Sequence, residues 1–341
     1  MAATEPTSLR VFIITRLFLM VPMFLTLLTI VFVILHVVPG DPVRALMGPR
    51  ASEEVVSRMR HELQLDRPLY MQYITYVANL LRGDLGFSIW TRTPVLTNIL
   101  QVFPATLEYS VPTIIVAALT GVSSGSLSAL KRNSSYDMLN RILTIALYSL
   151  PLFWLGMILQ LSFGLGLRWL PVTGRIDPRI ELTRITGFNL IDSILTGNFE
   201  AFVSSISHLI LPVITMMVWI SCIINRIART EMITILRQDY IAAANARGIP
   251  RNLVIYRHAL RNALVPLVTM MGLIFAWLLG GTAVVEITFS IYGMGRLFIT
   301  GIYNRDFPLI QGIVVFYSII VAVISLAIDL VYAYIDPRIR F

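Results

Sequence analysis

The chain has 341 residues, of which 56% are hydrophobic and only 13% are charged, and its mean hydropathy is +0.77. Because soluble proteins carry about 25% charged residues, this composition excludes a soluble enzyme and predicts an integral membrane protein. A net charge of +8 would suggest a nucleic-acid partner in a soluble protein. Here we expect no nucleic-acid partner. The positive charge instead indicates an inner or plasma membrane protein, because Lys and Arg are enriched in the cytoplasmic loops of such proteins. The single cysteine, Cys222, excludes a disulfide framework.

The first apolar run, 17–38, contains no Asp, Glu, Lys or Arg. At about 1.5 Å per residue it is long enough to cross a bilayer. Five further spans are expected near 107–130, 139–167, 209–224, 264–285 and 309–335. The sequence therefore predicts an all-α membrane protein with six transmembrane helices. Small residues in the second and fifth spans, among them Gly121, Gly125 and Gly272, predict close packing against other helices.

The positive-inside rule predicts the orientation. The loop 225–262 holds seven arginines against Glu231 and Asp239, so it is expected in the cytoplasm together with an N-tail, 1–16, and a C-tail, 336–341. Residues 39–106 then form an extracytoplasmic helical insertion, and 107–335 form the core with spans two to six. Within the insertion, one helix is expected after Ser52 and another from Pro68 to Gly83.

The inner loop has its own pattern, Asp239-Tyr240-Ile-Ala-Ala-Ala-Asn-Ala-Arg-Gly248-Ile-Pro250. It predicts a short Ala-rich helix that ends with Gly248 in the left-handed C′ position, followed by a proline that stops the helix. A basic helix is expected to begin near Arg251. From the pattern alone, a solvated hairpin that serves only topology remains an alternative.

This loop resembles the EAA motif of ABC-importer permeases, in which an Ala-Ala pair precedes a glycine. The chain is similar to the B-type subunits of the peptide/nickel permease family in this loop and in a series of other motifs. These are Pro39-Gly-Asp-Pro42, Leu65-Asp-Arg-Pro-Leu69, Gly83-Asp-Leu-Gly86, Pro104-Ala-Thr-Leu-Glu108, Arg257-His-Ala-Leu-Arg-Asn-Ala263, Tyr292-Gly-Met-Gly-Arg-Leu297, Arg305-Asp-Phe-Pro308 and Asp336-Pro-Arg-Ile-Arg340.

The resemblance implies a type I ABC-importer permease fold and a helix that docks on a separate ATPase subunit. The residues expected to carry this coupling are Asp239, Tyr240, Ala243, Ala244, Arg247, Gly248 and Arg251. The motif's leading glutamate is replaced by Ala242, so the contact must depend on packing or on neighbouring charges. The implied partners are a C-type permease, two ATPase subunits that bind ATP and Mg²⁺, an extracytoplasmic solute-binding protein, and lipid.

Several motifs are set aside. Residues 121–125 match G-x-S-x-G, but they lie inside an apolar span, where a nucleophile elbow has no strand-to-helix turn. A phosphate-binding loop is impossible because the only lysine, Lys131, follows a leucine. The four histidines have no metal-ligand spacing, so we expect no catalytic or metal site and no cofactor on this chain.

Charges near the spans, Asp137, Arg141 and Asp329, are expected to snorkel to the interface. Polar candidates for the translocation path are Ser149, Gln160 and Asn225. The family resemblance implies di- or oligopeptides as the solute, with oligosaccharides or nickel chelates as alternatives. A secondary carrier is a more distant alternative, for which inverted repeats would be expected.

Overall fold

The computed structural model describes residues 9–37, 43, 51–62, 65–281 and 283–335. These residues form helices, turns and one isolated bridge between Phe87 and Pro94. The signature at 39–42 and the predicted C-tail lie outside the described residues. The described part of the chain divides into two compact units, one that combines the residues up to Pro104 with Tyr292–Val323 and one that contains Ala105–Ile291 and the residues from Ile324 onward.

The first unit contains the first apolar helix and the segment expected as an insertion. Its elements are α1 (Leu9–Val37), α3 (Glu53–Glu62), α4 (Leu69–Leu81), the start of α5 (Val95–Leu130), α14 (Met294–Tyr303) and the first part of α15 (Phe307–Ile335). The helices expected after Ser52 and Pro68 are present as α3 and α4. Helix α4 packs on α1, where the Phe32 ring lies 5.2 Å from the Tyr73 ring and the Tyr73 hydroxyl lies 2.6 Å from Thr29 Oγ1.

Two of the family signatures, 83–86 and 305–308, lie close together in this unit. Asp306 precedes α15 and caps it, since one carboxylate oxygen accepts a hydrogen bond from the Leu309 amide at 3.2 Å. The other oxygen accepts from the Ser88 hydroxyl at 2.5 Å and the Trp90 amide at 3.1 Å. Asp306 is fully buried, so this carboxylate holds the turn after Gly86 against the start of α15.

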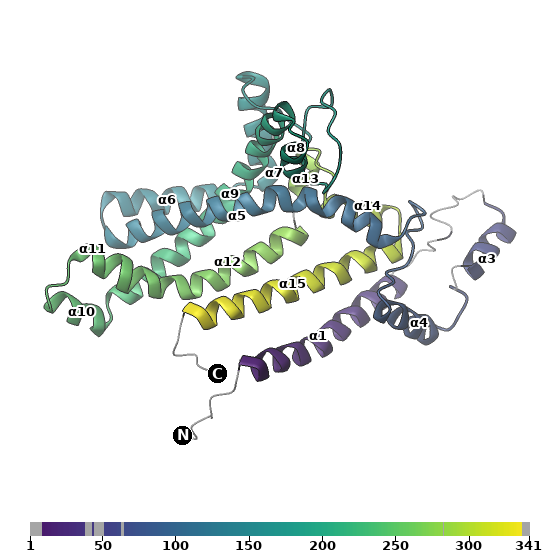
Figure 1. Cartoon of the computed structure of the whole chain (residues 1–341), viewed down its shortest axis with the longest axis horizontal. Helices are drawn as coiled ribbons and strands as arrows, with labels where there is room; N and C mark the ends of the chain where they lie inside the picture. Colours follow the sequence, from purple (N-terminus) through teal and green to yellow (C-terminus); the bar gives the residue numbers. More distant parts are fainter. Residues whose placement is uncertain (1–8, 38–42, 44–50, 63–64, 282, 336–341) are drawn as a thin grey trace. The chain divides into compact units, whose positions relative to one another are not determined.

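The second unit is arranged around α9 (Phe199–Leu236), which contacts helices on several sides. Its neighbours are α6 (Ser135–Tyr148), α7 (Leu152–Leu159), α8 (Asn189–Leu195) and α12 (Arg261–Gly281). Where α9 ends, α10 (Asp239–Ala246) and α11 (Arg251–Leu253) form a corner that leads back into α12 (Figure 1). Helix α13 (Ala283–Thr288) follows α12.

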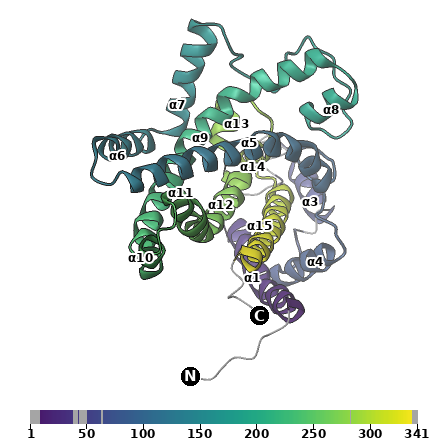
Figure 2. The same ribbon diagram turned by 60° about the vertical axis from the view of Figure 1, so that its left-hand side comes forward.

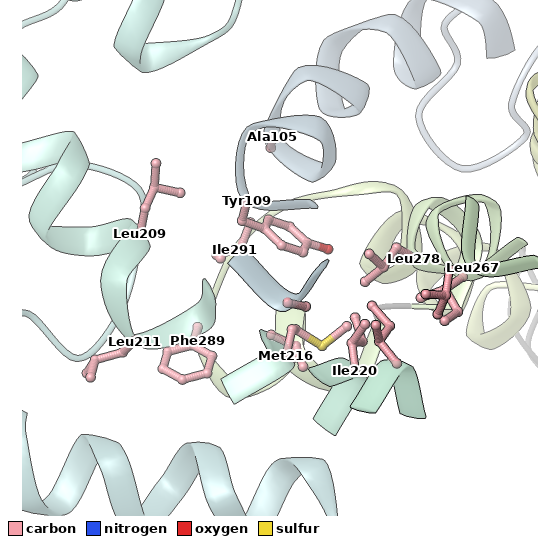
Figure 3. Close-up of a cluster of buried hydrophobic side chains, with 14 of the residues drawn as sticks. Ala105, Tyr109, Leu209, Leu211, Met216, Ile220, Leu267, Leu278, Phe289 and Ile291 are labelled. Atoms are coloured by element: carbon pink, nitrogen blue, oxygen red, sulfur yellow. The ribbon is translucent and has the colours of Figure 1, made fainter. Parts of the chain in front are cut away.

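The core of this unit lies between α5, α9 and α12. Tyr109, Met216, Ile220, Leu267 and Leu278 are fully buried and gather in one cluster (Figure 3). The Tyr109 hydroxyl donates a 2.7 Å hydrogen bond to the Glu286 carboxylate. The ring therefore fills the apolar core while its polar end stays satisfied.

Helices α5 and α9 approach closely because glycines face α9. A Cβ on Gly121 would lie 2.8 Å from the Ile224 Cβ, and one on Gly125 would come within 2.4 Å of the Asn225 carbonyl oxygen. Gly272 of α12 likewise leaves room for Ile328 of α15, whose Cδ1 would lie 2.1 Å from a Cβ. Close packing was expected from these small residues, and the structure confirms it.

The third predicted span is not one straight helix. Ser135–Tyr148 and Leu152–Gly166 meet at 97°, with α7 continued by the π-helical segment η1 (Gln160–Gly166). Figure 2 shows α7 turning away from α6. The physical cause is Pro151, which has no amide hydrogen to donate and disfavours helical geometry at the residue before it.

The six predicted spans are confirmed only in part. Within the described residues, four helices are long and apolar enough to cross a membrane, and a fifth is obtained if the bent pair counts as one span. Helix α1 contributes a shorter apolar stretch, Val21–Leu35. An all-helical membrane protein is confirmed, whereas six spans and cytoplasmic termini remain predictions.

The connection between η1 and α9 is built around a buried carboxylate. Asp192 is 1% exposed and accepts hydrogen bonds from the Thr186 hydroxyl at 2.6 Å and from the amides of Ile185, Thr186 and Gly187. Burial acts to raise the pKa of this carboxyl, but the hydrogen bonds from Thr186 and its neighbours outweigh it, so the pKa is lowered.

We expect Asp192 to make stability depend on pH. Because its folded pKa is lowered, its stabilisation is complete above the unfolded value of about 3.9 and is lost as the pH falls through the folded pKa. Thermal unfolding of the purified protein in detergent, measured between pH 3 and pH 7, should show a smaller loss on acidification for Asp192→Asn than for wild type. Equal pH profiles would contradict this role.

Gly125→Ala should destabilise the protein, because the new methyl group would meet backbone rather than a flexible side chain. Overpacking of this kind costs about 1–3 kcal/mol. The matched control is Ser123→Ala on the exposed face of the same helix. The midpoint of thermal unfolding should fall for Gly125→Ala only, and equal midpoints for the two variants would show that the helices separate without cost.

Candidate coupling site

The predicted corner after α9 is a well-defined helix end. Gly248 adopts φ +71°, a left-handed conformation that glycine accepts without a steric penalty. Its amide donates to the Asn245 carbonyl at 3.0 Å, and the Ile249 amide donates to the Ala244 carbonyl at 3.3 Å. This pair of hydrogen bonds is a Schellman motif, and it satisfies two carbonyls at the end of α10. The predicted position of Gly248 is confirmed.

One face of α10 is held by the protein itself. Ile241 and Ala244 are 2% and 5% exposed and belong to an apolar cluster with residues of α5, α9 and the helix that follows the corner. The other buried members of this cluster are Ala129, Met232, Val254, Ala259 and Ala263. The cluster therefore packs α10 against several helices at once.

The opposite face of α10 is open. Asp239, Tyr240, Arg247, Gly248 and Arg251 are exposed, and Ala243 is half-buried. Ala244 packs inward, so the exposed small residues of the helix are Ala242 and Ala246. The structure thus places five of the seven predicted coupling residues on one accessible corner and assigns Ala244 to packing beneath it.

Tyr240 anchors the corner to the next helix. Its hydroxyl accepts a hydrogen bond from the Asn262 amide nitrogen at 2.9 Å. Between Arg251 and Asn262 the chain passes through the π-helical segment η2 (Val254–Leu260), so α11, η2 and α12 form one helical run. The open face of α10 is therefore tied to a membrane span by both packing and a hydrogen bond.

Seven residues before the end of α9, an ion pair joins this helix to α6. Arg229 places Nε 2.7 Å and Nη2 2.8 Å from the two oxygens of Asp137. The same carboxylate accepts from the Ser128 hydroxyl at 2.5 Å and the Asn133 amide at 3.0 Å. Asp137 is fully buried, so the expectation that it snorkels to an interface is wrong. Its burial is possible because four hydrogen bonds satisfy its charge.

Asn225, predicted to begin the inner loop and to face a path, is instead a buried residue within α9. Its side-chain nitrogen donates to the Ser124 hydroxyl at 2.6 Å and its oxygen accepts from Asn140 at 3.2 Å. Helix α9 thus continues to Leu236, twelve residues beyond the predicted end of the span at 224. Asn225 and Arg229 explain part of this extension, because their side chains bond to other helices rather than to solvent.

The other two path candidates lie elsewhere and do not meet Asn225. Ser149 sits at the bend between α6 and α7, where its hydroxyl donates to the Ala146 carbonyl. The Gln160 side chain bridges two segments by donating to the carbonyls of Val172 at 2.7 Å and Thr288 at 3.0 Å. The hydrogen bonds of Ser149, Gln160 and Asn225 do not test whether these residues line a transport path.

Comparison with known proteins fits this geometry. Residues 121–341 match the family of binding-protein-dependent transport system inner membrane components, and residues 9–110 match the N-terminal family of the same membrane components. A dipeptide transport system permease protein, DppB, of Alkalihalophilus pseudofirmus is 39% identical over 96% of this chain and 98% of that protein. A di/tripeptide permease of Pseudomonas aeruginosa is 39% identical with the same coverage.

A glutathione transport system permease protein, GsiC, of Escherichia coli is 34% identical over 97% of this chain and 99% of its own length. A multi-helix membrane chain with full-length matches of this kind is a transporter subunit rather than an enzyme. The chain belongs to the family of inner membrane components of binding-protein-dependent transport systems.

Removal of one partner of the Asp137–Arg229 pair should be strongly destabilising. Asp137→Asn leaves a largely buried guanidinium without a counter-charge, for which a loss of about 3–5 kcal/mol is typical. The double variant Asp137→Asn with Arg229→Gln removes both charges and should recover part of that loss. Thermal unfolding of the purified complex measures both, and strictly additive effects would show that the pair does not couple α6 to α9.

Proposed function

We propose that this chain is the B-type transmembrane subunit of an ATP-driven importer of di- and oligopeptides. The full-length matches include permeases named for dipeptide, di/tripeptide and glutathione transport, which supports short peptides as the solute. The chain pairs with a C-type permease to enclose the path. An extracytoplasmic binding protein delivers the peptide, and two ATPase subunits bind ATP and Mg²⁺.

The observation that carries this proposal is the open face of α10 on a rigid corner. An ATPase groove receives this face, with Ala242 and Ala246 allowing close approach and Arg247 and Arg251 available for acidic partners. Because the motif's leading glutamate is Ala242, packing and these arginines replace its contact. A displacement of α10 passes to α9 and α12 through the cluster around Ile241, as a rigid lever requires.

The test is uptake by the intact importer in proteoliposomes. A radiolabelled dipeptide should enter only when ATP, the binding protein and both permeases are present, and vanadate should stop it while a protonophore should not. Uptake by this chain alone, or uptake abolished by the protonophore, would favour a secondary carrier. Transport of an oligosaccharide or a nickel chelate instead of peptides would leave the assembly intact and change the solute.

Gly248→Asp should uncouple ATP hydrolysis from uptake. The substitution puts a side chain into left-handed geometry, at a cost of about 1–2 kcal/mol, and adds a negative charge to the docking face. The matched control is Gly248→Asn, which has nearly the same shape, accepts the left-handed conformation more readily and carries no charge.

The ratio of peptide imported to phosphate released should fall several-fold for the Asp variant and stay near wild type for the Asn variant. An unchanged ratio in both variants would rule out this corner as the coupling site.

A further inference from the structure

Three aromatic side chains from three helices form a continuous stack on a surface of the second unit. The rings of Tyr148 and Trp219 lie 5.2 Å apart with an interplanar angle of 19°. Those of Trp219 and Trp277 lie 5.5 Å apart with an angle of 29°. Tyr148 is the last residue of α6 before the bend, Trp219 lies near the middle of α9, and Trp277 lies near the end of α12. We call these three residues the aromatic row.

Only the middle of the row packs against the core, because Trp219 is half-buried there while the rings at both ends are exposed. Tyr148 is 41% exposed and Trp277 is 40% exposed, whereas the Ile220 side chain next to Trp219 on α9 is fully buried. Stacked rings that stay half-exposed on a membrane protein must face lipid, a partner chain or a water-filled path. The guanidinium of Arg226 beside the row helps to distinguish among these three environments.

Arg226 lies at the Tyr148 end of the row, with its guanidinium carbon 6.0 Å from the centre of the Tyr148 ring. Among the described residues, its guanidinium has no ion pair or hydrogen bond, in contrast to Arg229, which is bound to Asp137. The Arg226 side chain is exposed, as are Thr230 and Thr234, one and two turns further along the same face of α9. This face is therefore a polar stripe that continues from the row.

Lipid is a poor neighbour for this stripe, because an unpaired guanidinium beside an apolar span is costly in hydrocarbon. Snorkelling does not remove that cost. Arg226 follows the apolar stretch 209–224, so the nearer interface lies toward α10. Its guanidinium instead lies against the Tyr148 ring, which stacks on Trp219 within that apolar stretch. Water or protein must therefore cover this face.

We propose that the aromatic row and Arg226 form the peptide-contacting surface of the translocation path. Arg226 binds the carboxylate of the peptide by charge-assisted hydrogen bonds, which a planar guanidinium makes well. The rings contact apolar side chains and peptide planes without selecting among them. A surface with one cation, to which no carboxylate is paired among the described residues, holds a short peptide weakly enough for release.

This inference rests on the proposed function, and it replaces the three earlier path candidates, whose polar groups bond within the chain. The alternative occupant is the second permease subunit. An interface there would need an acidic residue of that subunit against Arg226, whereas a path keeps the guanidinium hydrated until a carboxylate arrives.

The test uses the complete importer in proteoliposomes with saturating loaded binding protein. Arg226→Gln should lower the rate of dipeptide uptake about tenfold, as expected for one lost charge-assisted contact, while Arg226→Lys should restore part of the rate. Arg168→Gln removes a charge from an exposed turn outside the row, and its uptake should match wild type. Co-purification of the second permease subunit and the thermal midpoint should be unchanged in all three variants.

A direct contact is measured with a dipeptide that carries a benzophenone side chain. After illumination during transport, labelled fragments should contain Tyr148, Trp219 or Trp277, and Arg226→Gln should reduce their labelling. Loss of the second permease subunit from the purified Arg226→Gln importer would overturn the proposal and indicate a subunit interface. Labelling confined to other helices would also overturn the proposal. If wild type imports no dipeptide, the proposed function fails; if wild type imports and Arg226→Gln equals it, only this inference fails.

Discussion

Helices α5 and α9 touch backbone to backbone, and the hydrogen bond between Ser124 and Asn225 depends on that distance. At Gly121 and Gly125 no side chain of α5 holds the two backbones apart. At this separation the short side chain of Ser124 reaches Asn225 across the interface at 2.6 Å. In a bilayer, where apolar burial drives helix association only weakly, close backbone packing and hydrogen bonds between helices supply the specificity. A larger residue at either glycine would separate these partners.

The same packing extends toward the corner formed by α10 and α11. Ala129 at the end of α5 and Met232 of α9 share one apolar cluster with Ile241 of α10. The Asp137–Arg229 pair then fixes the start of α6 to α9. Helix α10 is therefore packed against several membrane helices at once, which is the mechanical requirement of the proposed coupling to a separate ATPase.

Polar residues of this chain divide into two groups by their partners. Asp137, Asp192 and Asn225 are buried, and each is satisfied by neighbouring donors or acceptors. Such groups stabilise a fixed arrangement because leaving them unsatisfied is costly. Arg226 is exposed and has no polar partner for its guanidinium within the described part of the chain. This contrast separates structural polarity from the surface proposed to meet the solute.

Much of the candidate coupling site could be predicted from the sequence because its signals are local. An Ala-rich stretch followed by Gly248 and Pro250 predicts where α10 ends, since helix termination depends on the backbone preferences of a few adjacent residues. The sequence did not predict which face of α10 is exposed. Ala243 and Ala244 are chemically identical, and only the packing of Ile241 and its cluster decides that Ala244 points inward.

The sequence by itself determined that this is a helical membrane protein, where its apolar segments lie and to which family its motifs belong. Composition, hydropathy and turn residues act locally, so one chain suffices to read them. Only the tertiary structure decided that Asp137 is buried rather than interfacial and that Asn225 belongs to a helix. It also brought Tyr148, Trp219 and Trp277 together. These facts depend on residues more than 50 positions apart, whose meeting no local pattern specifies.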